Sequence, residues 1–135
     1  MHVASTGDDE TGDGSAAAPY ATIQHGIDQA APGDTVLVAA GTYTGDGNRD
    51  LDFHDKDLVV RSADDDPAVC IIDCEGAPGA PHRGFVFDGL ETSSSVVRGF
   101  TVRGGYAVDR GGGILVSQQT AAGLPFSAGA LTALP

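Results

Sequence analysis

Residues 31–38 read APGDTVLV, and residues 39–43 continue with AAGTY. Pro32 followed by Gly33 ends a helix, and the TVLV run after them has the β-branched composition of a short strand. The side-chain periodicity therefore changes at this point from about 3.6 residues to two. We expect a helix before this stretch and a series of short strands after it.

The segment before this stretch predicts one helix, from Pro19 to about residue 31. Pro19 suits a first helical turn. Ile23 and Ile27 lie on one face at i,i+4 spacing, and Ala30 continues that face. The helix therefore has one apolar side, which needs another surface to cover it.

Short runs with a period of two follow Gly33 and are separated by Gly, Asp, Ser or Pro. They are TVLV at 35–38, LDF at 51–53, LVVR at 58–61, CIID at 70–73, GFVF at 84–87, VV at 96–97, FTV at 100–102 and ILV at 114–116, after a first strand expected at 2–5. Val36, Leu58, Phe85 and Ile114 recur at intervals of roughly 20 to 30 residues, the spacing of β-solenoid coils. The sequence lacks the Asn-Gly dipeptides that an antiparallel meander favours.

Residues 117–135 carry no charged side chain and show no alternation of apolar and polar residues. We therefore expect this tail not to continue the coils. Its role stays open between a cap over the open end, a contact with another molecule, and a disordered end or one left by premature termination. The chain accordingly divides into an N-terminal unit at 1–33, coils at 34–116 and a low-complexity tail at 117–135.

The charge balance restricts the partners. The chain of 135 residues has 19 acidic and 7 basic side chains and a formal net charge of -12. We therefore expect no nucleic acid partner and no anionic membrane, and a polyuronate would need bridging cations. Neutral glycans, cations and basic proteins remain open. No apolar run reaches the length of a membrane span, so we also expect no membrane insertion, and the chain shows no signal peptide.

The two cysteines, Cys70 and Cys74, lie on one predicted strand and its end. An extended strand would separate their Cα atoms by roughly 13 Å, which exceeds disulfide reach. We expect two reduced thiols buried inside the coils, and a turn that brings them together is the alternative. Two cysteines without nearby paired histidines do not make a zinc site.

Three stretches together resemble the opening of secreted right-handed β-helix proteins of the pectate-lyase-like superfamily. They are STGDD, GDG and PYATIQ within residues 5–24, APGDTVLV and GTY within 31–43, and VVRGFTVRGG and GGGI within 96–114. The resemblance implies an all-β fold, namely a right-handed parallel β-helix (solenoid) with an N-terminal capping α-helix, truncated here to about four coils. In such proteins the first strand and the helix close the end of the solenoid, which blocks edge pairing. The resemblance also implies an extracellular or cell-surface location.

The same resemblance indicates where a glycan would bind. Polysaccharide lyases of this architecture hold Ca²⁺ against a substrate uronate with carboxylates and remove a sugar proton with Arg or Lys. The candidate carbohydrate-binding residues are Asp73, Arg83, Asp88, Arg98 and Arg103. Alternate residues of adjacent strands would place some of them on one outer sheet. The alternative is a solvated exterior with ion pairs between successive coils.

Two acidic loops suggest a bound cation, with Ca²⁺ the first candidate. The candidate metal ligands are Asp8, Asp9 and Asp13 in the first loop and Asp46, Asn48 and Asp50 in the second. A cation would relieve the repulsion among these carboxylates. The second loop begins like an EF-hand, but Leu51 occupies the position that needs Gly, so it fails that motif. The alternative for both loops is a solvated turn with ordinary Asp and Asn capping.

These observations favour one functional hypothesis and leave two alternatives. The first is the N-terminal segment of a secreted β-helix protein of the carbohydrate-active or surface type, without catalytic activity itself, because members of the family usually continue for many more coils. The second is a Ca²⁺-dependent polysaccharide lyase or another glycan-modifying enzyme. The third is a structural or adhesive module that self-associates through its open C-terminal coil.

Overall fold

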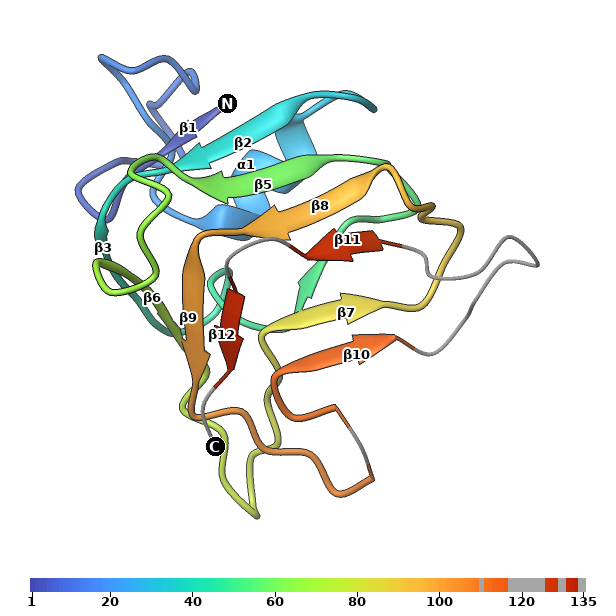
Figure 1. Ribbon diagram of the computed structural model, residues 1–135. Helices are drawn as coiled ribbons and strands as arrows, with labels where there is room; N and C mark the ends of the chain where they lie inside the picture. The colour runs from blue at the N-terminus through green and yellow to red at the C-terminus, as the bar shows by residue number, and fades with distance from the viewer. Residues whose placement is uncertain (110, 117–125, 129–130, 134–135) are drawn as a thin grey trace.

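The computed structural model describes residues 1–109, 111–116, 126–128 and 131–133, and this part of the chain consists mainly of short strands (Figure 1). The elements in chain order are β1 (His2–Val3), α1 (Ile23–Gln29), β2 (Thr35–Val38), β3 (Gly41–Tyr43), β4 (Leu51–Asp52), β5 (Val59–Ser62), β6 (Cys70–Asp73), β7 (Phe85–Phe87), β8 (Ser95–Arg98), β9 (Phe100–Arg103), β10 (Ile114–Val116), β11 (Phe126–Ala128) and β12 (Leu131–Ala133). The named strands pair in parallel throughout. The protein is an all-β fold of parallel sheets with little helix.

The strands form three sheets that the chain visits in a fixed order. Sheet A has the order β1-β2-β5-β8-β11, sheet B the order β12-β9-β6-β3, and sheet C the order β10-β7-β4. We call one passage from A through B to C a circuit: β2 to β4 form the first circuit, β5 to β7 the second, and β8 to β10 the third. Each strand pairs with the equivalent strand of the preceding circuit, as Figure 1 shows for β2, β5 and β8.

The register shows which residues are equivalent in successive circuits. In sheet A, Val36 pairs with Val60 and Val60 with Val97, whereas in sheet C Phe85 pairs with Ile114. The sequence analysis treated Val36, Leu58, Phe85 and Ile114 as equivalent positions of successive coils. This is wrong in one respect, because Val36 lies in sheet A whereas Phe85 and Ile114 lie in sheet C. Each circuit contains three strands of similar composition, and composition does not distinguish them.

The helix is shorter than the sequence predicts. It begins after Thr22, whose side chain accepts a hydrogen bond from the His25 backbone N–H at 3.3 Å. Pro19 lies outside the helix, because the adjacent Tyr20 pairs with Val3 in a parallel bridge. Backbone pairing with the first strand thus overrides the helical signal at Pro19. No helix among the described residues is long and apolar enough to cross a membrane.

Two strands lie in the tail that was expected not to continue the coils. β11 pairs with β8 in sheet A, and β12 pairs with β9 in sheet B, both in parallel. The expectation is therefore wrong for these two strands, which begin a fourth circuit. Pairing with an existing sheet edge uses backbone groups, so it does not require alternating side chains. The roles considered for the rest of the tail concern residues outside the described part.

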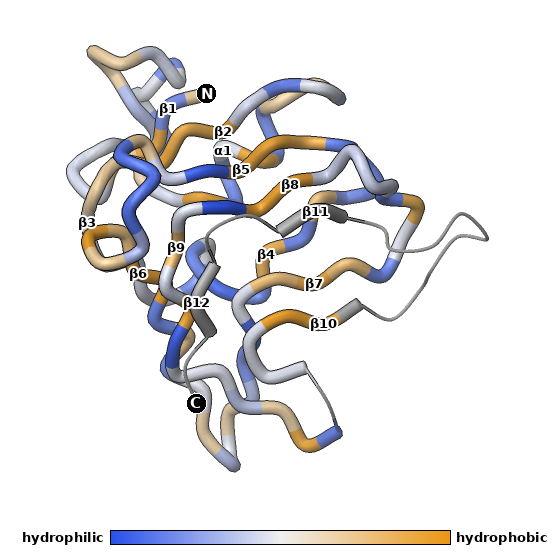
Figure 2. The backbone as a smooth tube through the Cα atoms, in the orientation of Figure 1, coloured by the Kyte–Doolittle hydropathy of each residue, from blue (hydrophilic) through white to orange (hydrophobic). Residues whose placement is uncertain are grey.

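Residues from all three sheets share one hydrophobic core. Buried and partly exposed positions alternate along strands such as β6 and β9. Four phenylalanine rings form a cluster within this core: the Phe85 ring lies 6.4 Å from the rings of Phe53 and Phe87 and 6.2 Å from that of Phe100, between centroids. Figure 2 shows the apolar segments of the neighbouring strands β7 and β10.

The helix α1 covers the end of the first circuit. Its residues Ile23 and Ile27 are buried in the core, and it contacts β1, β2 and β4. The Gln24 side chain pairs with the edge of β4 as a strand would: Nε2 donates to the Asp52 carbonyl at 2.9 Å, and Oε1 accepts from the Asp52 N–H at 3.0 Å. This contact occupies backbone groups at the β4 edge of sheet C that could otherwise pair with another chain.

Lys56, the only lysine in the sequence, caps the C-terminal end of α1 through hydrogen bonds to its carbonyl groups. Its Nζ donates to the carbonyls of Ile27 at 2.6 Å and Ala30 at 2.9 Å, where a helix end has unpaired carbonyls and partial negative charge. We expect Lys56→Met to lower the free energy of unfolding by about 1–2 kcal/mol in urea titrations. Lys56→Arg keeps the charge and serves as the control. An unchanged midpoint for Lys56→Met would contradict this role.

Candidate functional site

The five candidate carbohydrate-binding residues are distributed over three sheets. They are Asp73 and Arg103 on sheet B, Arg98 on sheet A, and Arg83 and Asp88 beside β7 of sheet C. Asp73 and Arg103 face each other in register, with Asp73 Oδ2 3.0 Å from Arg103 Nε. The structure therefore brings this pair together on one outer face but does not gather all five residues.

Ion pairs between successive circuits hold several of these side chains. Arg98 pairs with Asp65 through both its Nε and Nη2 atoms. Arg83 pairs with Asp109, and its Nε donates to the Gly111 carbonyl at 3.1 Å. These are the ion pairs between successive coils that the sequence analysis gave as the alternative to a glycan site. Glycan binding at the five residues stays a prediction. Asp88 is exposed at the end of β7.

The first acidic loop uses its carboxylates on its own backbone and on the start of α1. Asp8 Oδ1 accepts from the N–H groups of Glu10 at 2.7 Å and Thr11 at 3.0 Å, and Asp13 Oδ1 accepts from Ser15 at 2.9 Å. These hydrogen bonds lower the pKa values of Asp8 and Asp13. The loop therefore has the Asp capping that the sequence left open as the alternative.

The second acidic loop separates its three candidate ligands. Asp46 is exposed and pairs with Arg49 at 3.1 Å. Asp50 Oδ2 lies 2.6 Å from His82 Nδ1, and its Oδ1 accepts from the Arg83 N–H at 2.7 Å. Asn48 is buried beneath the start of α1. Among the described residues, no three His, Cys, Asp or Glu side chains gather as a metal site would require, and calcium binding at either loop stays a prediction.

Asp9 connects the first acidic loop to the start of α1, and its carboxylate makes the stability of the folded protein depend on pH. Its Oδ1 accepts from the Ala21 N–H at 2.7 Å and the Thr22 N–H at 3.1 Å, and its Oδ2 accepts from the Thr22 hydroxyl at 2.7 Å. Burial acts to raise the pKa of Asp9, but these hydrogen bonds outweigh it and lower the pKa.

Because the folded pKa of Asp9 is below the unfolded value, its stabilisation is present above the unfolded pKa of about 3.9 and is lost as the pH falls through the folded pKa. We expect Asp9→Asn to be less stable than the wild type at neutral pH and the difference to shrink below about pH 4. Thermal unfolding from about pH 2 to 7 measures this difference. A difference that does not change with pH would contradict the assignment.

A ladder of side chains on the outer face of sheet A was missed by the sequence reasoning. The register pairs His2 with Leu37, Leu37 with Arg61, and Arg61 with Arg98. The signal was present in the sequence, because VVR occurs at residues 59–61 and again at 96–98. We call His2, Leu37, Arg61 and Arg98 the basic ladder.

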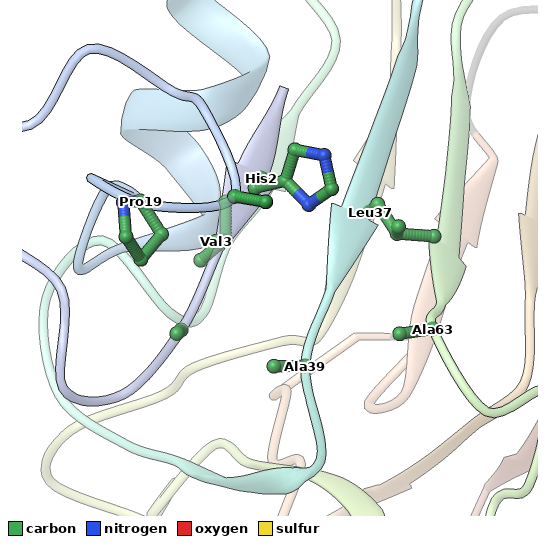
Figure 3. Close-up of a pocket in the computed structure, with 8 residues that line it drawn as sticks. His2, Val3, Pro19, Leu37, Ala39 and Ala63 are labelled. Atoms are coloured by element: carbon green, nitrogen blue, oxygen red, sulfur yellow. The ribbon is translucent and has the colours of Figure 1, made fainter.

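A shallow hollow lies beside the basic ladder at the β1 end of sheet A. Its volume is about 100 Å³, and its lining is His2, Val3, Ala4, Ala16, Pro19, Leu37, Ala39 and Ala63. Figure 3 shows His2 and Leu37 along one side of it, with the short side chains of Ala39 and Ala63 below them. A surface of this kind can accept the apolar face of a small ring, with polar groups at its edge.

The fold and these outer faces define an all-β protein of parallel sheets with charged exteriors. The family model described as "Protein of unknown function (DUF1565)" matches residues 5–50. This segment contains the two acidic loops, α1, β2 and β3. No curated protein and no solved structure matches the chain significantly.

Proposed function

We propose that this chain is the capped N-terminal portion of a right-handed parallel β-helix of the pectate-lyase-like class, that its outer faces bind polysaccharide, and that this portion is not itself catalytic. Three arguments support the fold. The chain visits three parallel sheets in a fixed order. Crossovers between parallel strands of one sheet are almost always right-handed. The family matched at residues 5–50 is associated with β-helix proteins.

The binding proposal rests on one observation, the in-register outer face. Successive circuits place equivalent side chains about 4.8 Å apart along the stack, and Asp73 beside Arg103 on sheet B is an example. A glycan lying on such a face meets repeated donors and acceptors, because its hydroxyl groups can both accept from Arg and donate to Asp. The net charge of -12 favours a glycan that is mostly neutral.

An extracellular or cell-surface location is part of the proposal, and the cysteines are compatible with it. Cys70 and Cys74 are buried and unpaired, as the sequence predicts. Burial raises the pKa of each thiol to about 11. Because the thiolate is the reactive form, two such thiols would oxidise slowly in an oxidising compartment.

The experiment is a titration of the protein with neutral oligosaccharides of several linkages, followed by amide chemical shifts. We expect saturable shifts on the outer faces. The double variant Asp73→Asn, Arg103→Gln is expected to weaken binding roughly tenfold. Asp64→Asn, in an exposed loop, is the matched control. No saturable shift across neutral and acidic glycans would overturn the proposal.

A second candidate is a Ca²⁺-dependent polysaccharide lyase or another glycan-modifying enzyme, which one observation favours. The contact of 2.6 Å between His82 and Asp50 is that of an imidazole oriented by a carboxylate, the arrangement of a general base. Incubation with pectate, alginate and chondroitin in the presence of Ca²⁺, followed by the absorbance of unsaturated uronates, tests it. Product formed by the wild type and lost in His82→Gln would support this candidate function. The absence of product from all three substrates would count against a lyase.

Self-association through the outermost strands is a further proposal on the same fold. Among the residues that the structure describes, β10 is the outermost strand of sheet C, and one edge of an outermost strand has backbone groups that can pair with another chain. Light scattering across a range of protein concentrations tests it. A monomer at every concentration would argue against it.

A further inference from the structure

Asp-Gly dipeptides occur in the sequence at residues 13–14, 46–47 and 88–89. Such a pair is chemically labile, because glycine has no side chain to hinder its backbone nitrogen, which can attack the carboxyl carbon of the preceding aspartate. In an unfolded chain the three pairs react at similar rates, since the reaction depends on the dipeptide itself. The fold therefore decides which pair stays reactive.

Hydrogen bonds protect the glycine nitrogen in the first and third pairs. The Gly14 N–H donates to the Ala18 carbonyl at 3.1 Å, and the Gly89 N–H donates to Glu91 Oε2 at 3.1 Å. Each of these hydrogen bonds must open before the nitrogen can turn towards the carboxyl group of the preceding aspartate. The structure therefore slows the reaction at both pairs.

The second pair lacks this protection. Asp46 and Gly47 lie at the centre of a turn that the Asn48 N–H closes by donating to the Gly45 carbonyl at 3.1 Å. Among the hydrogen bonds of the described residues, none is donated by the Gly47 N–H. The Asp46 side chain is 98% exposed, and its ion pair with Arg49 at 3.1 Å is of the weak, solvated kind. Both reacting groups are therefore accessible in the folded protein.

We propose that Asp46 converts spontaneously to isoaspartate and that the conversion loosens the cap of α1; this inference does not rest on the proposed function. The Gly47 nitrogen bonds to Cγ of Asp46 and loses its proton, and one carboxyl oxygen leaves as water, which gives a five-membered succinimide. Water then opens the ring. Opening at the α-carbonyl leaves the main chain running through Cγ, with a free α-carboxylate, whereas opening at Cγ returns aspartate. The water lost and the water added balance, and no oxidant or reductant takes part.

The conversion reaches α1 because the turn supplies two contacts to its first residues. The Gly47 carbonyl accepts from the Gln24 N–H at 2.9 Å, and Asn48 Oδ1 accepts from the Ile23 N–H at 3.0 Å. Isoaspartate inserts one methylene into the main chain beside both contacts, so N–H groups of the first helical turn lose their partners. The fold nevertheless needs glycine here, because Gly47 has a φ of 86° and a Cβ on it would lie 2.9 Å from the Thr22 Cβ.

The test is incubation of the full chain in H₂¹⁸O, followed by peptide fragmentation in a mass spectrometer. Each opening of the ring places one heavy oxygen in the carboxylate, which locates the reaction. In the folded protein we expect Asp46 to gain the label roughly tenfold faster than Asp13 or Asp88, because their glycine nitrogens are hydrogen-bonded. In concentrated urea we expect similar rates at the three positions, which would assign the selectivity to the fold.

Asp46→Glu is the matched control, because it keeps the charge but would have to close a slower, six-membered ring. We expect it to lose the label at position 46 and to retain the rates at Asp13 and Asp88. Wild type stored for weeks is expected to have a lower unfolding midpoint in urea than fresh protein, and stored Asp46→Glu to be unchanged. Equal labelling of the three positions in the folded protein, or faster labelling at Asp13 or Asp88, would overturn the inference. An unchanged midpoint after conversion would overturn the effect on α1.

Discussion

Replacing Phe85 by alanine is expected to lower the free energy of unfolding by about 3–5 kcal/mol, the largest effect of any single substitution considered for this protein. The Phe85 side chain is fully buried. Its ring contacts those of Phe53, Phe87 and Phe100, so its removal leaves a cavity bordered by the three other rings. Its strand neighbours in the first and third circuits are Leu51 and Ile114, which would lose their packing against it.

Urea unfolding followed by circular dichroism measures this effect. Val86→Ala is the matched control, because Val86 is on the same strand and only partly buried. We expect the control to lose less than about 1 kcal/mol. Equal losses for the two variants would show that the aromatic cluster is not the centre of the core.

The second large effect is expected at Asn48, the only asparagine in the sequence. Its Oδ1 accepts from the Ile23 N–H at 3.0 Å, and its Nδ2 donates to the Thr44 carbonyl at 3.0 Å. The side chain is buried and joins the second acidic loop to the first turn of α1. Asn48→Ala leaves the buried Ile23 N–H without a partner and removes the donor to the partly buried Thr44 carbonyl, so we expect a loss of about 2–3 kcal/mol.

Asn48→Asp separates this structural role from the calcium hypothesis. Aspartate retains the acceptor for Ile23 but loses the donor to Thr44 and places a carboxylate against that carbonyl. We expect Asn48→Asp to be less stable than the wild type, with or without Ca²⁺. A calcium ligand would behave differently, because an added carboxylate would strengthen binding and Ca²⁺ would raise the unfolding temperature.

Most of the strands could be predicted from the sequence, and the reason is their side-chain periodicity. CIID at residues 70–73 alternates buried and partly exposed positions, and it forms β6 with the expected bounds. The stop at Pro32 and Gly33 was also readable, because Gly33 adopts a φ of 90° that suits glycine. The start of α1 could not be predicted from the sequence, because Tyr20, next to Pro19, pairs with β1, a strand distant in sequence.

The candidate sites depended on partners that no local pattern contains. Asn48, Asp50 and Asp46 are close in sequence, yet the structure directs them to α1, to His82 and to Arg49 respectively. An acidic loop in the sequence shows how many carboxylates are near one another but not which N–H groups or cations they will meet. The spacing of the metal candidates therefore could not distinguish a cation site from capping.

The sequence by itself determined that the chain alternates short strands with turns, that one amphipathic helix precedes them, that both thiols are buried and that the net charge is -12. These properties follow from local periodicity and from composition. Only the tertiary structure decided which strands are neighbours, and with them the register that sets Arg61 opposite Arg98 and the capping role of Asn48. Parallel strands pair across long connections, so their register depends on loop conformation and core packing, which act over the whole circuit.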